Sequence, residues 1–172
     1  MNRLTLILTL LLSGCTGIPE GVKPIDGFEV NRYLGKWYEI ARLDHRFERG
    51  LNHITAEYRL RNDGGIDVTN SGYNAETGKW EQAKGRAYFI ATPDKGRLKV
   101  SFFGPFYGGY NIIELDKQDY AYALVAGPDR DYLWILARTP ALDRTILARL
   151  IDKARSLGFA TDQLIFTEQN SK

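Results

Sequence analysis

The stretch YLGKWYEIAR, residues 33–42, decides the fold of this chain. Trp37, Tyr38 and Ile40 are aromatic or β-branched residues, which favour an extended backbone. The whole chain has the same character, because it contains 10 Tyr, 8 Phe and 3 Trp together with 17 Gly in 172 residues. Aromatic-rich sequence punctuated by glycine favours strands. The stretch therefore predicts a first β-strand over residues 35–42.

Alternating polarity continues this pattern toward the C-terminus. In ITAEYRL, for example, Ala56, Tyr58 and Leu60 share one side of a strand and charged or polar residues share the other. A period of two with one apolar face is typical of antiparallel strands. Eight strands joined by short turns predict an all-β fold, an up-and-down antiparallel barrel. The predicted strands cover residues 35–42, 54–60, 66–71, 81–91, 97–102, 108–115, 120–127 and 131–138.

One segment after the last predicted strand breaks the period of two. Its apolar residues follow the spacing of one helical stripe; they are Leu142, Ile146, Leu147, Leu150, Ile151, Ala154 and Leu157. Gly158 stands where a helix stop belongs. We expect one amphipathic helix over residues 141–158, packed outside the barrel on Leu133 and Ile135. QLIFT, residues 163–167, predicts a short final strand at the barrel edge.

The first residues predict export and a lipid anchor. Arg3 precedes an apolar run that ends at Leu12, which is too short to cross a bilayer as a helix of ~20 residues. Cys15 is the only cysteine, so no intramolecular disulfide can form. The sequence Leu-Ser-Gly-Cys, residues 12–15, resembles the lipobox of bacterial lipoproteins, which implies a lipid on the Cys15 sulfur and cleavage before this residue. The alternative is a stray or buried cysteine. In these lipoproteins an aspartate directly after the cysteine is the signal for retention in the inner membrane. Thr16 stands at that position here, so the resemblance implies the outer membrane.

These signals divide the chain into three parts. Residues 1–14 are expected to be a lipoprotein signal peptide, and residues 15–24, rich in proline and glycine, a lipidated tether. Residues 25–172 would form one domain. The formal net charge is only +2, which gives no reason to expect a nucleic-acid partner.

Two motifs resemble the lipocalin family. Its first motif is Gly-x-Trp, here Gly35-Lys36-Trp37, and its third is an arginine after the last barrel strand, here Arg138. The resemblance implies that Trp37 closes the narrow end of the barrel and that Arg138 stacks across it.

Two longer stretches, DHRFERG and SFFGPFYGGYN, are similar to the bacterial outer-membrane lipoproteins of this family. They imply storage or transport of lipids for membrane maintenance under envelope stress. They also imply a position on the outer membrane facing the periplasm, and they allow a homodimer.

The inward positions of the predicted barrel suggest a ligand cavity. Small residues leave room there, and aromatic residues supply an apolar wall. The candidate ligand-binding residues are Ala56, Tyr58, Val68, Asn70, Ala87, Phe89, Val100, Phe102, Tyr110, Ala123, Val125, Tyr132 and Trp134. The expected ligand is a fatty acid or lysophospholipid, with its tail in the barrel and its head group near Arg46 and Arg49 at the open end. The alternatives are a barrel filled by its own side chains and arginines that simply face water.

Catalysis has little support in the sequence. His45 and His53 are the only histidines, and no serine elbow, paired-cysteine motif or phosphate loop accompanies them. We expect no catalytic residues, no metal and no cofactor. Two other function classes stay open. One is a lipocalin-fold isomerase or hydrolase that acts on an amphiphile, and the other is a structural envelope lipoprotein with an empty barrel.

Overall fold

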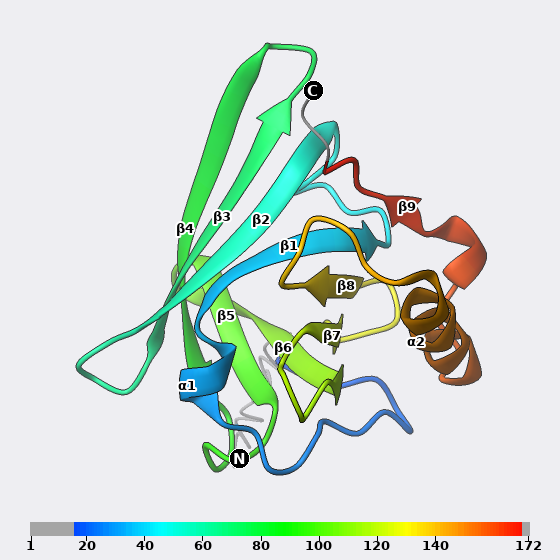
Figure 1. The fold of residues 1–172 in the computed structure, drawn as a ribbon. Coiled ribbons are helices and arrows are strands. Elements are labelled where there is room, and N and C mark those ends of the chain that lie inside the picture. The colour runs from blue at the N-terminus through cyan, green and yellow to red at the C-terminus, as the bar shows by residue number, and fades with distance from the viewer. Residues whose placement is uncertain (1–15, 170–172) are drawn as a thin grey trace, which may run out of the picture.

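The computed structural model describes residues 16–169, which form a barrel of antiparallel strands with a helix outside it (Figure 1). The predicted signal peptide and Cys15 lie outside the described residues. The helical elements are α1 (Val30–Tyr33), α2 (Arg144–Ser156) and the 3₁₀ turn η1 (Thr161–Gln163). The strands are β1 (Gly35–Arg42), β2 (Leu51–Leu60), β3 (Ile66–Asn74), β4 (Lys79–Phe89), β5 (Arg97–Phe103), β6 (Phe106–Leu115), β7 (Tyr122–Ala126), β8 (Leu133–Ala137) and β9 (Ile165–Phe166).

The sheet closes as the sequence predicts. Each of β2 to β8 pairs with its neighbour in the sequence, and β1 pairs with both β8 and β2. The largest differences from the predicted strand boundaries are three residues each: β3 ends at Asn74 rather than residue 71, and β2 begins at Leu51 rather than residue 54. A bulge between Asn52 and Thr55 interrupts the alternation there, and His53 takes a positive φ of 53°. A period-two pattern cannot continue through such a bulge, so the sequence placed the start of β2 three residues too late.

The C-terminal segment closes a seam in the barrel. β1 leaves β2 after Tyr38, and β9 pairs with the remaining end of β1 at Ala41 and Arg42. The amide of Thr167 then donates to the carbonyl of Ile40 at 3.1 Å. The amide of His53 on β2 donates to the carbonyl of Glu168 at 2.8 Å. Residues 165–169 therefore bridge the two diverging strands.

Helix α2 lies on the outside of the barrel beside β7 and β8 (Figure 1). Leu150 and Ala154 on the helix belong to the same buried cluster as Leu133 and Ile135 on β8, which confirms the predicted docking surface. The Asp143 side chain caps the first turn by accepting hydrogen bonds from the amides of residues 145 and 146. Gly158 ends the helix with φ +85°, as its position in the sequence predicts.

The described residues of the predicted tether, residues 15–24, contact the barrel. Val22 is buried in the cluster outside the barrel, and the carbonyl of Gly17 accepts a hydrogen bond from the Asn111 side chain at 3.1 Å. The carbonyl of Glu20 accepts one from Arg130 at 2.7 Å. The proline and glycine content predicts a tether between the lipid and the fold, and within it these backbone carbonyls find partners on the barrel surface.

The barrel has two different ends. Helix α1 and the residues after β8 lie at one, which we call the closed end. The loops after β1, β3, β5 and β7 lie at the other, which we call the mouth. Within residues 16–169, none of the helices combines the length and the apolar character needed to cross a bilayer.

Candidate functional site

The closed end is sealed by Trp37 and Arg138. Trp37 is fully buried, and its indole nitrogen donates to the carbonyl of Tyr33 at 2.8 Å. The guanidinium carbon of Arg138 lies 4.0 Å from the centroid of the Trp37 ring. Gly35 lies next to the Arg138 guanidinium and has φ +92°, a backbone conformation that residues with a side chain rarely adopt. This is the stacking contact that the two motifs imply.

The inner wall contains most of the side chains that strand parity points inward. Asn70 lies between Ala56 and Ala83 in the register, and Tyr132 lies in the loop after β7, where its ring stacks on Trp134 with centroids 6.1 Å apart. The other predicted positions belong to one cluster inside the barrel, namely Ala56, Tyr58, Val68, Ala87, Phe89, Val100, Phe102, Tyr110, Ala123, Val125 and Trp134.

Burial divides this wall into two parts. Ala87 and Ala123, which we expected to leave space for a ligand, are only 4% and 0% exposed. Neighbouring side chains therefore cover both positions, and the small residues there reflect close packing. Surface accessible inside the barrel remains at half-buried apolar residues; these are Ala56, Phe89, Val100, Phe102, Tyr110 and Trp134. A ligand would meet this second set.

A hollow of about 400 Å³ lies at the mouth, between the loop after β1, the loop after β7 and η1. Both predicted head-group residues, Arg46 and Arg49, line it together with His45, Phe47 and Tyr132. Arg49 forms an ion pair with Asp44 at 2.6 Å, and this pairing holds the pKa of the Asp44 carboxyl below its usual value. Arg46 is exposed and takes part in none of the ion pairs described for this loop. Arg130 also lines the hollow, but its guanidinium donates to the carbonyls of Leu157 and Glu20, so Arg46 is the more available cation.

A cluster of buried charged groups lies behind this hollow. Glu39, Arg42, His45 and Glu48 are all buried, and a Glu39 carboxylate oxygen lies 2.7 Å from Arg42. A Glu48 oxygen lies 3.0 Å from the His45 ring and accepts a hydrogen bond from the Trp134 indole at 3.2 Å. The cluster therefore connects the loop after β1 to the inner wall.

The pKa values of the two carboxyls in this cluster, Glu39 and Glu48, are shifted in opposite directions. Burial and the nearby negative charge of Glu48 raise the pKa of Glu39 to about 8, although Arg42 opposes the shift. Burial acts on Glu48 in the same direction, but hydrogen bonding and charge from His45, together with further hydrogen bonds, bring its pKa below the usual value. At neutral pH, Glu39 holds a proton and Glu48 carries the charge. This cluster was not predicted; its signal in the sequence is the i,i+3 pair of Glu39 and Arg42 inside an apolar strand.

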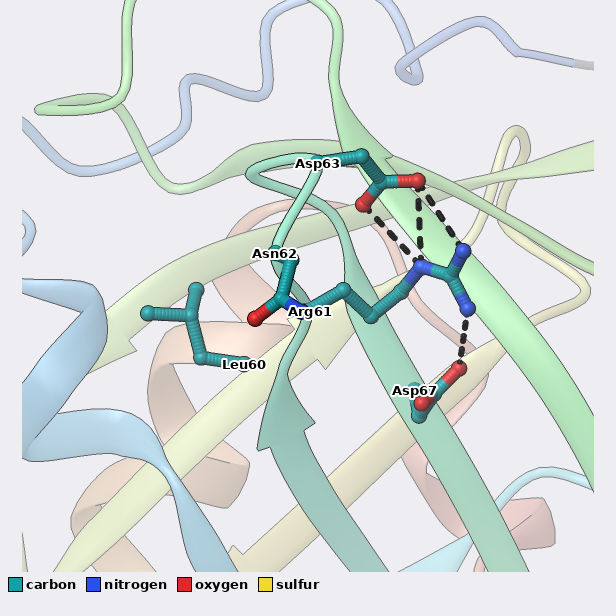
Figure 2. A pocket seen from close by; sticks show the side chains of 5 residues that line it. All are labelled: Leu60, Arg61, Asn62, Asp63 and Asp67. Carbon is teal, nitrogen blue, oxygen red and sulfur yellow. Dashed lines mark hydrogen bonds and ion pairs between the residues drawn. The ribbon is translucent and has the colours of Figure 1, made fainter.

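A second hollow, of about 410 Å³, opens at the turn between β2 and β3 (Figure 2). Arg61 dominates it, and Figure 2 shows its guanidinium held between Asp63 and Asp67 at 3.0 and 2.8 Å. Arg61 and the amide of Gly65 hold the pKa of Asp63 at about 2. Because both carboxylates are already paired with the one cation, this hollow offers no unpaired charge to a ligand.

The described residues show no arrangement of a nucleophile and a base around either histidine. His45 faces Glu48, and the ring of His53 packs near Tyr73 and Trp80. Within residues 16–169, no three His, Cys, Asp or Glu side chains form a group that could hold a metal ion.

The chain is similar to a protein family, to known relatives and to solved structures. A family model described as a lipocalin-like domain matches residues 28–169. The outer membrane lipoprotein Blc of Vibrio cholerae serotype O1 is 56% identical over 170 residues, covering 98% of this chain and 99% of that protein. The outer membrane lipoprotein Blc of Escherichia coli K12 is 54% identical over 151 residues, covering 88% and 85%. Insecticyanin from the tobacco hornworm shares the fold, with a TM-score of 0.71 at 20% identity over 90% of this chain and 88% of that one.

Proposed function

The chain belongs to the lipocalin family, and from this membership we propose that it binds fatty acids or lysophospholipids with the acyl tail inside the barrel. It is an outer-membrane lipoprotein, like the relatives named above. The observation that carries the ligand proposal is the half-buried apolar wall of the barrel. Apolar surface left accessible inside a protein is typical of small-molecule sites.

The head group would lie in the hollow at the mouth. Arg46 offers a guanidinium with no carboxylate partner among the described ion pairs, and guanidinium groups recognise phosphate and carboxylate oxygens well. Tyr132 and His45 connect this hollow to Trp134 on the inner wall, with His45 and Trp134 centroids 5.2 Å apart. One amphiphile could therefore occupy both places, with its charged end near Arg46. Arg49 would play a smaller part because Asp44 already pairs with it.

The membrane attachment, the physiological role and the assembly complete the proposal. Lipidated Cys15 would hold the protein on the outer membrane, and storage or transport of lipids would serve membrane maintenance under envelope stress. A homodimer would cover Phe103 and Phe106, which are 70% and 78% exposed at the turn between β5 and β6. Sedimentation of the wild type and of a Phe103→Ser, Phe106→Ser variant tests this part, and equal masses for both would contradict it.

The direct test of ligand binding is native mass spectrometry of protein extracted gently from membranes. A bound fatty acid or lysophospholipid is expected, and delipidated protein should take up the same lipid again. Protein that neither carries nor takes up lipid would favour the structural envelope protein. Conversion of the bound lipid during incubation would favour the isomerase or hydrolase.

A further inference from the structure

Three tyrosine hydroxyls meet inside the barrel. Tyr33 comes from α1, Tyr58 from β2 and Tyr110 from β6. The Tyr110 oxygen lies 2.8 Å from the Tyr33 oxygen and 2.8 Å from the Tyr58 oxygen. All three rings belong to the cluster inside the barrel. The hydroxyls therefore form a polar group in otherwise apolar surroundings.

The three hydroxyls cannot all donate hydrogen bonds to one another. Three hydroxyls carry three protons, and the two contacts through Tyr110 use only two of them. The Tyr58 and Tyr33 oxygens have no hydrogen-bond partner other than Tyr110 among the described protein groups. One O–H donor is thus left without a protein acceptor, and a buried donor without a partner is costly.

The hydroxyls remain donors at neutral pH. Burial raises the pKa of Tyr58 and that of Tyr110 well above the usual value, so neither group ionises there. Burial does the same to the pKa of Tyr33. A group of neutral hydroxyls with a spare proton suits a ligand oxygen that accepts a hydrogen bond.

The half-buried apolar wall leads to this group. Half-buried Ala56 precedes Tyr58 by two residues on the same face of β2, and Tyr110 is itself half-buried, whereas Tyr33 and Tyr58 are only 2% and 6% exposed. Val100 and Phe102 continue the wall on β5 toward the mouth. The part of a bound acyl ligand that reaches deepest would therefore meet this group of hydroxyls at Tyr110, the half-buried member.

We propose that Tyr33, Tyr58 and Tyr110 form a subsite that hydrogen-bonds an oxygen atom at the deep end of a bound acyl ligand. The oxygen could be a hydroxyl at the far end of a chain whose head group lies near Arg46, or the carboxyl of a fatty acid that enters head first and therefore does not reach Arg46. This subsite rests on the proposed function, since it requires an acyl chain in the barrel. It predicts that the protein distinguishes oxygen-bearing ends from plain hydrocarbon ends.

Calorimetric titration of the delipidated full chain with three probes tests the subsite. The probes are a saturated fatty acid, the same acid with a terminal hydroxyl, and a lysophospholipid with the same plain chain. Tyr110→Phe removes the central hydroxyl and keeps the ring. Tyr107→Phe, a half-buried tyrosine three residues earlier on β6, is the matched control.

One hydrogen bond gained or lost corresponds to about threefold to tenfold in affinity. A chain-end oxygen is indicated if wild type prefers the terminal hydroxyl by that factor and Tyr110→Phe removes the preference. A head-first carboxyl is indicated if Tyr110→Phe weakens the plain fatty acid by that factor and leaves the lysophospholipid unchanged. Either result supports the subsite, provided that Tyr107→Phe behaves as wild type.

Equal effects of Tyr110→Phe on all three probes, or no effect on any, would overturn the subsite while leaving the proposed function intact. Failure of wild type to bind any probe would instead remove the proposed function and the subsite with it. Thermal melting shows whether the variant is folded. If Tyr110→Phe does not fold, Tyr58→Phe serves in its place, because its hydroxyl contributes to the same chain of hydrogen bonds.

Discussion

The guanidinium carbon of Arg138 lies 4.0 Å from the centre of the Trp37 ring, although the two residues stand at opposite ends of the barrel sequence. Arg138 also donates to the carbonyls of Lys36 and Arg32 at 2.9 and 2.7 Å. It thereby connects the end of β8 to the start of β1 and to α1. A charged guanidinium on an indole face adds a favourable cation–π contact.

Replacement of Trp37 should destabilise the protein strongly. Trp37→Ala removes a fully buried ring and its hydrogen bond to Tyr33, so the free energy of unfolding should fall by about 3–5 kcal/mol. Denaturant unfolding of wild type and variant measures this difference. Trp80→Ala is the matched control, because Trp80 is 63% exposed, and it should change the value by about 0.5 kcal/mol. Equal losses for both variants would contradict the sealing role of Trp37.

Stability should depend on pH through Glu39. Its pKa is raised from 4.5 to about 8 in the folded state, so the folded protein binds this proton more tightly than the unfolded chain does. The stabilisation is therefore fully present below about pH 4.5 and is lost as the pH rises through about 8. The lowered pKa of Glu48 has the opposite effect on the pH dependence of stability. The stabilisation from Glu48 is present near neutral pH and is lost in acid.

Glu39→Gln separates the two effects, because glutamine resembles the protonated carboxyl and cannot ionise. Thermal midpoints of the variant should stay flatter than those of wild type on the alkaline side. Glu57→Gln, which changes a solvent-accessible carboxyl on β2, should follow the wild-type curve. Parallel curves for wild type and Glu39→Gln would show that Glu39 is not protonated in the folded protein.

Ala56 is the position at which a larger side chain should block the ligand. It is half-buried on the inner wall, whereas Ala87 is covered and would be overpacked by a large residue. Ala56→Trp should weaken binding of a long-chain lysophospholipid at least tenfold, about 1.4 kcal/mol. Glu57→Trp places the same ring on the outer face of β2 and should bind as wild type does. Unchanged affinity in a folded Ala56→Trp protein would mean that the acyl tail lies elsewhere.

Asn111 should hold the N-terminal segment on the barrel. Its side-chain nitrogen donates to the carbonyls of Gly17 and Gly127 at 3.1 Å each. Asn111→Ala leaves both carbonyls without this partner and should cost about 1–3 kcal/mol. Hydrogen exchange at the amide of Val22, which bonds the carbonyl of Pro19, should become faster in the variant. Asn74→Ala, which removes three solvent-exposed hydrogen bonds at the distant turn between β3 and β4, should leave that exchange rate unchanged.

Membrane attachment should depend on Cys15. Cys15→Ser removes the thiol that would carry the lipid, so the protein should appear uncleaved or in the soluble periplasmic fraction. Fractionation of cells that express wild type or variant measures the change. A Cys15→Ser protein that remains with the outer membrane would show that the attachment has another origin.

The sequence alone determined the elements that depend on local pattern. Period-two alternation gave the barrel strands, and one helical stripe gave α2 with its stop at Gly158. These features are recorded within a few neighbouring residues, so no knowledge of the fold is needed to recognise them. The contact between Trp37 and Arg138 was implied by the resemblance of the two motifs to the lipocalin family rather than by a local pattern.

Only the tertiary structure decided which groups meet across the barrel. Ala87 has the parity of a wall residue, but packing around it determines that no ligand space remains there. The hydroxyls of Tyr33 and Tyr110 stand 77 residues apart in sequence and 2.8 Å apart in space. Thr167 likewise reaches Glu39 only because β9 pairs with β1. Burial and long-range proximity arise from closing the sheet, and closure is a property of all the strands together rather than of any one segment.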